Sequence, residues 1–176
     1  MKVYTIVLEK WIFYFFLFFI PVQTRYIFAR WTQPFNEWTA GFIYLTDILL
    51  FILFIFWFLK FVKLENLKLK TPNLEFYTNP AFWLALFLIW AGLSTLSALY
   101  LKEVSLFRLL KLIEFALLYF YFKSNFSRLW NREATLVVLA SGFFQAVIGI
   151  VQYFKQASLG LKFLGESHLN LTLSGV

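Results

Sequence analysis

The amino-acid sequence predicts an all-α, polytopic transmembrane helix bundle with five spans. Three observations support this fold class: an extreme apolar composition, five long apolar runs, and Lys and Arg residues clustered between the runs. Of the 176 residues, 61% are hydrophobic and only 14% are charged, whereas a soluble domain has about 45–50% apolar and about 25% charged residues. So little charge does not cover this much Phe and Trp in water, so the sequence favours a bilayer as the solvent.

The five apolar runs define the expected elements. A span needs about 20 apolar residues, and helices are expected because lipid offers no partner for an unpaired backbone group. The chain is therefore expected to form one transmembrane domain over residues 1–176, with spans at 5–28, 42–62, 81–101, 104–122 and 134–154.

Basic residues are divided unevenly between the two sides of the predicted membrane. One set of alternate segments carries nine of the sixteen Lys and Arg residues and the other carries five, while Arg108 and Lys111 lie inside the fourth run. Because basic segments stay in the cytoplasm, the N-terminus is predicted to be cytoplasmic. In this orientation 60–80, which mixes Lys with Leu, is a cytoplasmic interfacial linker, and 155–176 begins an extracytoplasmic loop.

The fourth run contains three charged residues, Arg108, Lys111 and Glu114, at spacings of three. On a helix they share an arc of roughly 120°. Three charges at a helix centre cost about 8–10 kcal/mol, and the Val, Leu, Ile and Phe residues of the run return about 4–7 kcal/mol. This helix is therefore not expected to bury all three charges in lipid; they lie off-centre, or face a bundle interior or a wet cavity.

Two interpretations of these charges remain open. In the first, Arg108 snorkels to the outer headgroups from a depth of about 6 Å, and Lys111 and Glu114 form a structural (i, i+3) ion pair. In the second, two cations with one carboxylate between them bind a further anion. A lipid-linked pyrophosphate is then the expected anion, because guanidinium and ammonium groups bind phosphate oxygens strongly.

Other polar residues inside the runs favour helix packing. Asp47 is expected to accept hydrogen bonds from neighbouring helices. Gln145 and Gln152 lie seven residues apart, hence on one helix face, and Gly142 and Gly149 repeat that spacing. Gly at such spacing indicates close packing of helices, and Gln bridges helices.

The sequence predicts no catalytic constellation, metal site or cofactor. It has no Cys and a single His, His168, so neither a thiol nucleophile nor a His cluster for a metal is expected. A GxSxG motif and a phosphate-cradling glycine loop are also missing. The formal net charge of +7 would suit nucleic acid, but cations that flank apolar runs are typical of membrane proteins, so no nucleic-acid partner is expected.

Four segments follow one another in a characteristic order: FIPVQTRYIF at 19–28, FIYLTDILLFIL at 42–53, RLLKLIEFALLYFY at 108–121 and GFFQAVIGIVQYFKQASLGLKFLGES at 142–167. Together they resemble the N-terminal portion of the O-antigen ligase family, which also includes O-antigen polymerases. The resemblance covers nearly the whole chain and rests on loose, hydrophobic motifs.

The resemblance implies a multi-pass glycosyltransferase of the bacterial cytoplasmic (inner) membrane. Such an enzyme transfers a glycan from undecaprenyl pyrophosphate to a lipid or glycan acceptor in cell-surface polysaccharide biosynthesis, without a metal. It implies that Arg25, Arg108 and Lys111 contact the lipid-linked pyrophosphate, with Glu114 as their charge partner.

The family's catalytic loop, which carries an Arg and a His, has no counterpart in these residues. The chain is therefore expected to be the N-terminal fragment of a larger GT-C-like membrane protein, without a catalytic residue of its own. Its expected partners are membrane lipid, the lipid-linked oligosaccharide and the missing C-terminal helices of the same chain.

Two other functions remain open. A small transporter or channel would line its path with the charged face of the fourth run, but it would be expected to break its helices with Gly or Pro near the midplane, and Pro21 lies near a run's end. A non-catalytic membrane subunit would bind a partner protein through its helix faces.

Overall fold

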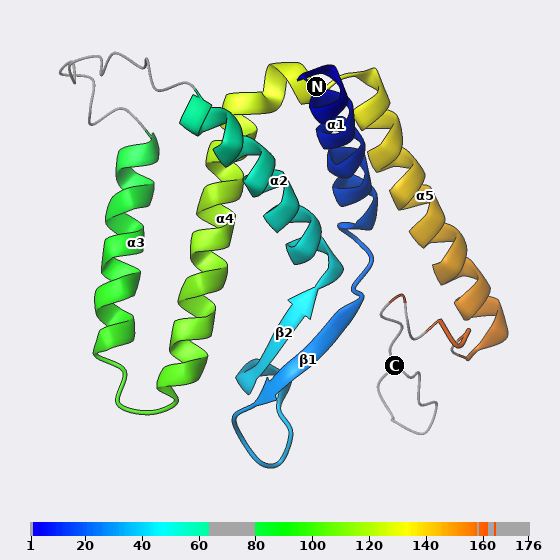
Figure 1. Ribbon diagram of the computed structural model, residues 1–176. Helices are drawn as coiled ribbons and strands as arrows, with labels where there is room; N and C mark the ends of the chain where they lie inside the picture. Colours follow the sequence, from blue (N-terminus) through cyan, green and yellow to red (C-terminus); the bar gives the residue numbers. More distant parts are fainter. Residues whose placement is uncertain (1, 64–79, 158, 162–163, 165–176) are drawn as a thin grey trace. The chain divides into compact units, whose positions relative to one another are not determined.

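The computed structural model describes residues 2–63, 80–157, 159–161 and 164, with side chains described from residue 5 to 60 and from residue 80 onwards (Figure 1). The elements are α1 (Lys2–Phe19), β1 (Arg25–Arg30), the 3-10 turn η1 (Glu37–Thr39), β2 (Ala40–Tyr44), α2 (Leu45–Lys63), α3 (Pro80–Leu96), α4 (Lys102–Leu129) and α5 (Arg132–Lys155). The predicted linker 60–80 and loop 155–176, including His168, lie largely outside the described residues.

The chain divides into two compact units. The first comprises Met1–Tyr26, Phe42–Phe56 and Asn125–Val176, and the second comprises Ile27–Gly41 and Trp57–Ser124.

The all-α prediction is wrong, because β1 and β2 pair in a two-stranded sheet. The predicted first helix, 5–28, ends at Phe19 instead, because Pro21 disfavours the helical conformation in the residue before it. The segment RYIFAR that follows is rich in residues that favour strands. Backbone hydrogen bonds close the hairpin at its two ends. The Trp31 N–H donates to the Thr39 carbonyl at 3.3 Å, and the Leu45 N–H donates to the Thr24 carbonyl at 3.1 Å.

The prediction of a five-span bundle is also wrong. Among the described residues, α5 is the one helix that is long and apolar enough to cross a membrane. Only 11% of its apolar window is buried, whereas a helix in the core of a soluble protein is mostly buried. Asn131 caps the start of α5 by accepting a hydrogen bond from the N–H of Ala134 at 3.0 Å.

The other four helices lack a sufficient uninterrupted apolar length. Glu9 and Lys10 interrupt α1. The apolar stretch of α2 lies between Asp47 and Lys60 and is about 18 Å long at 1.5 Å per residue. α3 has 17 residues, or about 25 Å, against a hydrocarbon core of about 30 Å. α4 carries the three charged residues of the fourth run.

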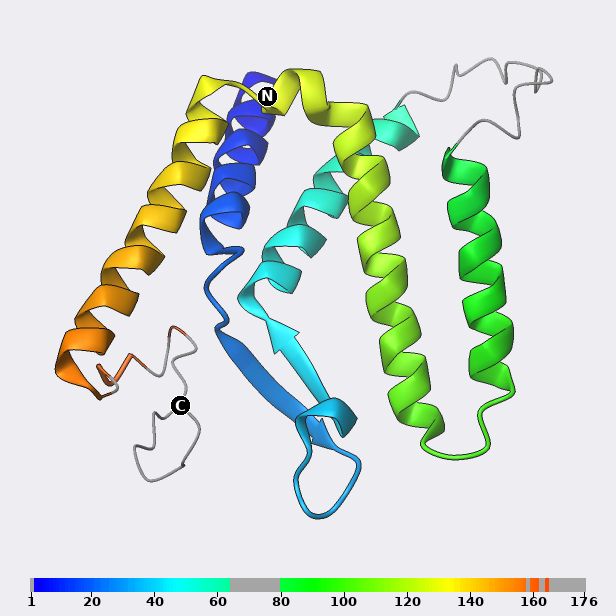
Figure 2. The same cartoon turned by 180° about the vertical axis from the view of Figure 1, so that it is seen from behind.

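The first unit packs α1 against α5, which lie side by side in both views (Figures 1 and 2). Phe13 and Leu17 of α1 are buried. Phe18 meets Phe144 with ring centroids 5.8 Å apart, and the hydroxyl of Ser141 donates to the Phe18 carbonyl. Apolar rings and a buried hydroxyl therefore join the end of α1 to the middle of α5.

The second unit has its most buried large side chain at Tyr121 of α4, which is fully buried. The Tyr121 ring meets Trp57 edge-on, with centroids 6.2 Å apart. No residue of α3 is buried, although the helix has no charged residue. The residues of α3 are thus half-buried or exposed within the described structure.

We predict that a charge in the middle of α5 impairs membrane insertion much more than a charge at its end. Phe143 is central and 74% exposed, and Phe154 lies in the last turn and is 79% exposed. Phe143→Lys is expected to lower the ratio of inserted to non-inserted α5 by about 60- to 400-fold, from a cost of about 2.5–3.5 kcal/mol. The inserted fraction of α5 in a reporter membrane protein measures this.

The matched control is Phe154→Lys, whose ammonium group reaches the interface. Equal insertion of the two variants would show that α5 does not span.

Candidate functional site

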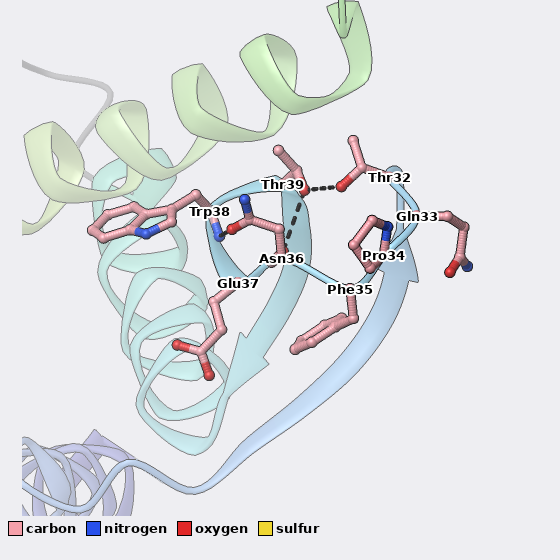
Figure 3. Close-up of a pocket in the computed structure, with 8 residues that line it drawn as sticks. All are labelled: Thr32, Gln33, Pro34, Phe35, Asn36, Glu37, Trp38 and Thr39. Atoms are coloured by element: carbon pink, nitrogen blue, oxygen red, sulfur yellow. Dashed lines mark hydrogen bonds between the residues drawn. The ribbon is translucent and has the colours of Figure 1, made fainter. Parts of the chain in front are cut away.

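The loop of the β1–β2 hairpin, residues 32–39, lines an open hollow of about 530 Å³ (Figure 3). The loop is closed by its own hydrogen bonds. Asn36 Oδ1 accepts from the N–H of Trp38 at 2.9 Å, and the Asn36 carbonyl accepts from the N–H of Thr39 at 3.1 Å. The hydroxyls of Thr32 and Thr39 are also hydrogen-bonded to each other. These bonds hold the Trp38 backbone in place and leave its side chain 77% exposed.

Three aromatic rings join this hairpin to α4. Phe107 lies 5.7 Å, centroid to centroid, from both Phe28 and Trp31, and Phe28 and Trp31 are 6.1 Å apart. The rings of Phe28 and Trp31 come so close to Gly41 that a Cβ there would meet them at 2.6 and 2.8 Å. The absence of a side chain at Gly41 therefore leaves room for the two ring tips beside β2, and a Cβ at this position would force these tips to move.

The aromatic contact places Arg108, the next residue of α4, against the loop. Arg108 Nη2 donates to the carbonyl oxygen of Trp38 at 2.9 Å, and the Arg108 side chain is otherwise exposed. Within the described part of the chain, no carboxylate forms an ion pair with Arg108. Guanidinium has five N–H donors, so most of them remain open to a further acceptor.

Lys111 and Glu114 form the (i, i+3) ion pair of the first interpretation, with Lys111 Nζ 2.9 Å from Glu114 Oε2. Both side chains are 23% exposed. The ammonium group also lies 6.0 Å from the centroid of the Phe107 ring. The positive charge of Lys111 is therefore compensated within α4, whereas that of Arg108 meets a neutral carbonyl.

The two arginines of β1 lie at its opposite ends. Arg25 belongs to the first unit, and its guanidinium lies 4.7 Å from the centroid of the Phe42 ring. Arg30 belongs to the second unit and lies 5.4 Å from the Phe35 ring. The structure thus brings an arginine of the hairpin into the unit of Arg108, and that arginine is Arg30 and not Arg25.

Asp47 lies in the first turn of α2, where its carboxylate accepts a hydrogen bond from the backbone N–H of Tyr44 at 2.8 Å. An acidic residue at this position satisfies an otherwise unpaired donor at the start of a helix. This contact is local, so it caps α2 and does not itself join two helices.

The polar residues of α5 lie on a face that is partly open. Gln145 Nε2 lies 3.5 Å from the Pro21 carbonyl, just beyond α1, and Gln152 is half-buried. A Cβ at Gly142 or Gly149 would meet no described atom within 4 Å. Close helix packing at these two glycines is therefore not found within the described residues.

Sequence reasoning missed a buried ion pair in the first unit. Glu9 is fully buried, and both of its carboxylate oxygens accept from Arg128, from Nη1 and Nη2 at 2.8 Å each. Arg128 Nη2 also donates to Asn125 Oδ1 at 2.6 Å. The signal in the sequence was Glu9 itself, an acid inside an apolar run, but its partner lies 119 residues away.

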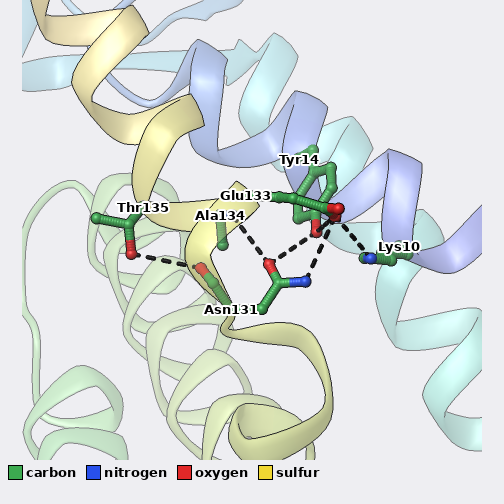
Figure 4. A network of polar contacts seen from close by, with 6 residues as sticks. All are labelled: Lys10, Tyr14, Asn131, Glu133, Ala134 and Thr135. Carbon is green, nitrogen blue, oxygen red and sulfur yellow. Dashed lines mark hydrogen bonds and ion pairs between the residues drawn. The ribbon is translucent and has the colours of Figure 1, made fainter.

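A second polar network lies where α1 meets the start of α5 (Figure 4). Lys10 Nζ forms an ion pair with Glu133 Oε2 at 2.7 Å. The Tyr14 hydroxyl faces two acceptors, Glu133 Oε2 at 2.7 Å and Asn131 Oδ1 at 2.9 Å. The hydrogen bond to Glu133, followed by that to Tyr14, raises the pKa of Lys10. Together with the Glu9–Arg128 pair, this network fixes α1 to the α4–α5 turn.

Within the described residues, no three His, Cys, Asp or Glu side chains form a group that could hold a metal. No family model, curated protein or solved structure matches this chain. The distinctive element of the candidate site is Arg108, which donates to the backbone carbonyl of Trp38 and forms no ion pair with a carboxylate of the described residues.

We predict that removing one partner of the buried pair destabilises the first unit. Arg128→Met leaves the Glu9 carboxylate buried without a cation, which is expected to lower the free energy of unfolding by about 3 kcal/mol. The double variant Glu9→Met with Arg128→Met is expected to recover most of this loss. Denaturant titration in detergent micelles measures both.

Arg132→Met is the matched control, because Arg132 is exposed on the neighbouring helix. A loss as large as that of Arg128→Met would contradict the assignment.

We predict that the contact between α1 and α5 weakens in alkali. The pKa of Lys10 is raised above its usual value of 10.5, so the folded state binds this proton more tightly than the unfolded state. The contribution of Lys10 to stability is fully present below about pH 10.5 and is lost as the pH rises through the raised pKa. Thermal unfolding midpoints between about pH 8 and pH 12 measure this.

In Lys10→Met this part of the alkaline loss disappears, while changes that are common to both proteins remain. Parallel pH profiles of the two proteins would refute the prediction.

Proposed function

We propose that this chain is the N-terminal, membrane-anchored part of an O-antigen ligase-like glycosyltransferase in the bacterial cytoplasmic membrane. In this proposal Arg108 contacts the pyrophosphate of a glycan carried on undecaprenyl pyrophosphate. The four segments that resemble the family support the proposal, as does α5, which is long and apolar enough to provide an anchor.

The observation that carries the proposal is the environment of Arg108. Its guanidinium is held at a fixed point by the Trp38 carbonyl, 2.9 Å away, and has no carboxylate partner within the described chain. An arginine side chain needs only water to solvate its charge, so solvation does not explain why the hairpin carbonyl is held against Arg108. Planar guanidinium donors match pyrophosphate oxygens in geometry and charge, so a phosphate group is the ligand that this arrangement fits best.

Lys111 and Arg25 have secondary parts in this proposal. Lys111 is already paired with Glu114, so its charge becomes available to a ligand only when that pair opens. Arg25 lies in the first unit against Phe42. We therefore assign the direct contact to Arg108 and a supporting electrostatic effect to Lys111.

The role of Arg108 in the reaction would be electrostatic. Glycan transfer breaks the bond between the anomeric carbon and the pyrophosphate oxygen, and a hydroxyl oxygen of the acceptor forms the new bond and loses its proton. A cation beside the departing pyrophosphate stabilises the negative charge that develops there. The group that accepts the proton is expected in the family's catalytic loop, which these residues do not contain.

A non-catalytic membrane subunit is the second candidate. The open space beside Gly142 and Gly149 on α5 favours it, because small residues allow another helix to approach closely. In that case α5 would bind a partner helix, and Arg108 would have no effect on the binding of lipid-linked glycan.

We predict that Arg108→Gln, made in the longest protein that contains this chain, lowers the affinity for undecaprenyl pyrophosphate by about 10- to 150-fold. This corresponds to the loss of a charged hydrogen bond worth about 1.5–3 kcal/mol. Arg108→Lys is expected to keep part of the affinity, since it keeps the charge and loses the planar fork. The affinities of the unmodified protein and of both variants for this lipid are measured in nanodiscs.

Two controls sharpen the test. Lys102→Gln removes an exposed cation from the start of the same helix and is expected to leave the affinity unchanged. Glu114→Gln releases Lys111 and is expected to raise the affinity. Unchanged affinity in a folded Arg108→Gln protein would reject the proposed contact and favour the subunit.

A further inference from the structure

The hairpin loop presents two apolar rings on a backbone that is fixed by its own hydrogen bonds. The side chains of Phe35 and Trp38 are 44% and 77% exposed. Trp38 is held on both sides, since Asn36 accepts from its N–H and Arg108 donates to its carbonyl. Large rings displayed on a closed loop are arranged before any partner binds, which lowers the entropy cost of binding.

The charge around these rings is positive. Arg30 lies 5.4 Å from the Phe35 ring and is exposed, and Arg108 lies at the Trp38 carbonyl. One carboxylate, that of Glu37, belongs to the same loop. Two guanidinium groups and one carboxylate therefore lie at this loop, which leaves a net positive charge beside the rings.

We propose that the loop 32–39 is an interfacial anchor that inserts Phe35 and Trp38 among the headgroups of an anionic bilayer, with Arg30 contacting lipid phosphate. Tryptophan prefers the headgroup layer, where the ring is buried and the indole N–H stays wet. An arginine beside the tryptophan is attracted to anionic lipid, and each such cation raises the binding constant for an anionic membrane about fivefold. A bilayer is the partner at hand for a chain whose α5 is long and apolar enough to span one.

This surface goes beyond the proposed function, because it needs neither a glycan nor a polyprenyl chain. Its contact with phosphate is assigned to Arg30, whereas the pyrophosphate contact is assigned to Arg108. The two proposals are tested with different lipids and different variants, so either one can fail alone.

The absence of cysteine from the sequence allows a single label to be placed. Gln33 is exposed, and its side chain extends away from the other loop side chains (Figure 3), so Gln33→Cys carries a nitroxide label. The full chain is reconstituted into vesicles of phosphatidylcholine, alone or mixed with phosphatidylglycerol, without any polyprenyl lipid. Depth is measured by electron paramagnetic resonance, from the accessibility of the label to oxygen and to a water-soluble nickel complex.

In vesicles that contain phosphatidylglycerol we expect the label to lose access to the nickel complex and to gain access to oxygen. In phosphatidylcholine alone this shift is expected to be smaller. Arg30→Gln is expected to abolish the difference between the two lipids, and Trp38→Ser to restore nickel access in both. Glu37→Gln, which removes the loop's carboxylate, is expected to increase the depth in the anionic vesicles.

Phe35→Ser provides a second test of the rings if Trp38→Ser does not fold. Lys102→Gln, an exposed cation elsewhere in the same unit, is the matched control and is expected to leave the label depth unchanged. Equal and full nickel access in both kinds of vesicle would overturn the proposal. So would an anionic-lipid effect that survives Arg30→Gln, or a label that becomes protected only when undecaprenyl pyrophosphate is added.

Discussion

The buried carboxylate of Glu9 is the constraint on which the first unit depends. A carboxylate removed from water is stable only with a cation and hydrogen bonds in good geometry, and Arg128 supplies both oxygens with donors at 2.8 Å. This requirement fixes the end of α4 against α1, which in turn determines where α5 begins. Among the described residues no buried side-chain nitrogen or oxygen is left without a partner, so the apolar packing of α1 on α5 develops around a satisfied polar contact.

The parts of the site that the sequence predicted are those that depend on local spacing. Lys111 and Glu114 are three residues apart on one helix, so their ion pair follows from helix geometry alone. The partners of Arg108 and Glu9 lie 70 and 119 residues away, and no periodicity indicates such pairings. The position of Arg30 beside the loop was not predictable either, because it depends on a hairpin that was predicted as helix and as loop.

For the fold too, the sequence predicted local elements better than their number and arrangement. The helices predicted at 81–101, 104–122 and 134–154 exist as α3, α4 and α5, because long apolar runs without Pro or Gly clusters favour helices. The largest differences are at the ends of α3 and α4, which lie at Leu96 and Leu129. The predicted number of spans was wrong because each hydrophobic run was assumed to be long enough to cross a membrane. Glu9 and Lys10 interrupt the first run, and Pro21 ends it early. Gly41 was an available signal for the hairpin, since a glycine inside a strand marks a close approach of another group.

The positions of Arg108 and Lys111 show how one helix face can carry two cations with different roles. Lys111 is compensated by Glu114 one turn further along, and its ammonium group lies 6.0 Å from the centroid of the Phe107 ring. Arg108 is held by a backbone carbonyl, an acceptor that orients the guanidinium without cancelling its charge. Because Phe28, Trp31 and Phe107 bring that carbonyl to α4, the aromatic richness of the sequence does more than make the chain apolar. It sets the position of an arginine that forms no ion pair with a carboxylate of the described residues.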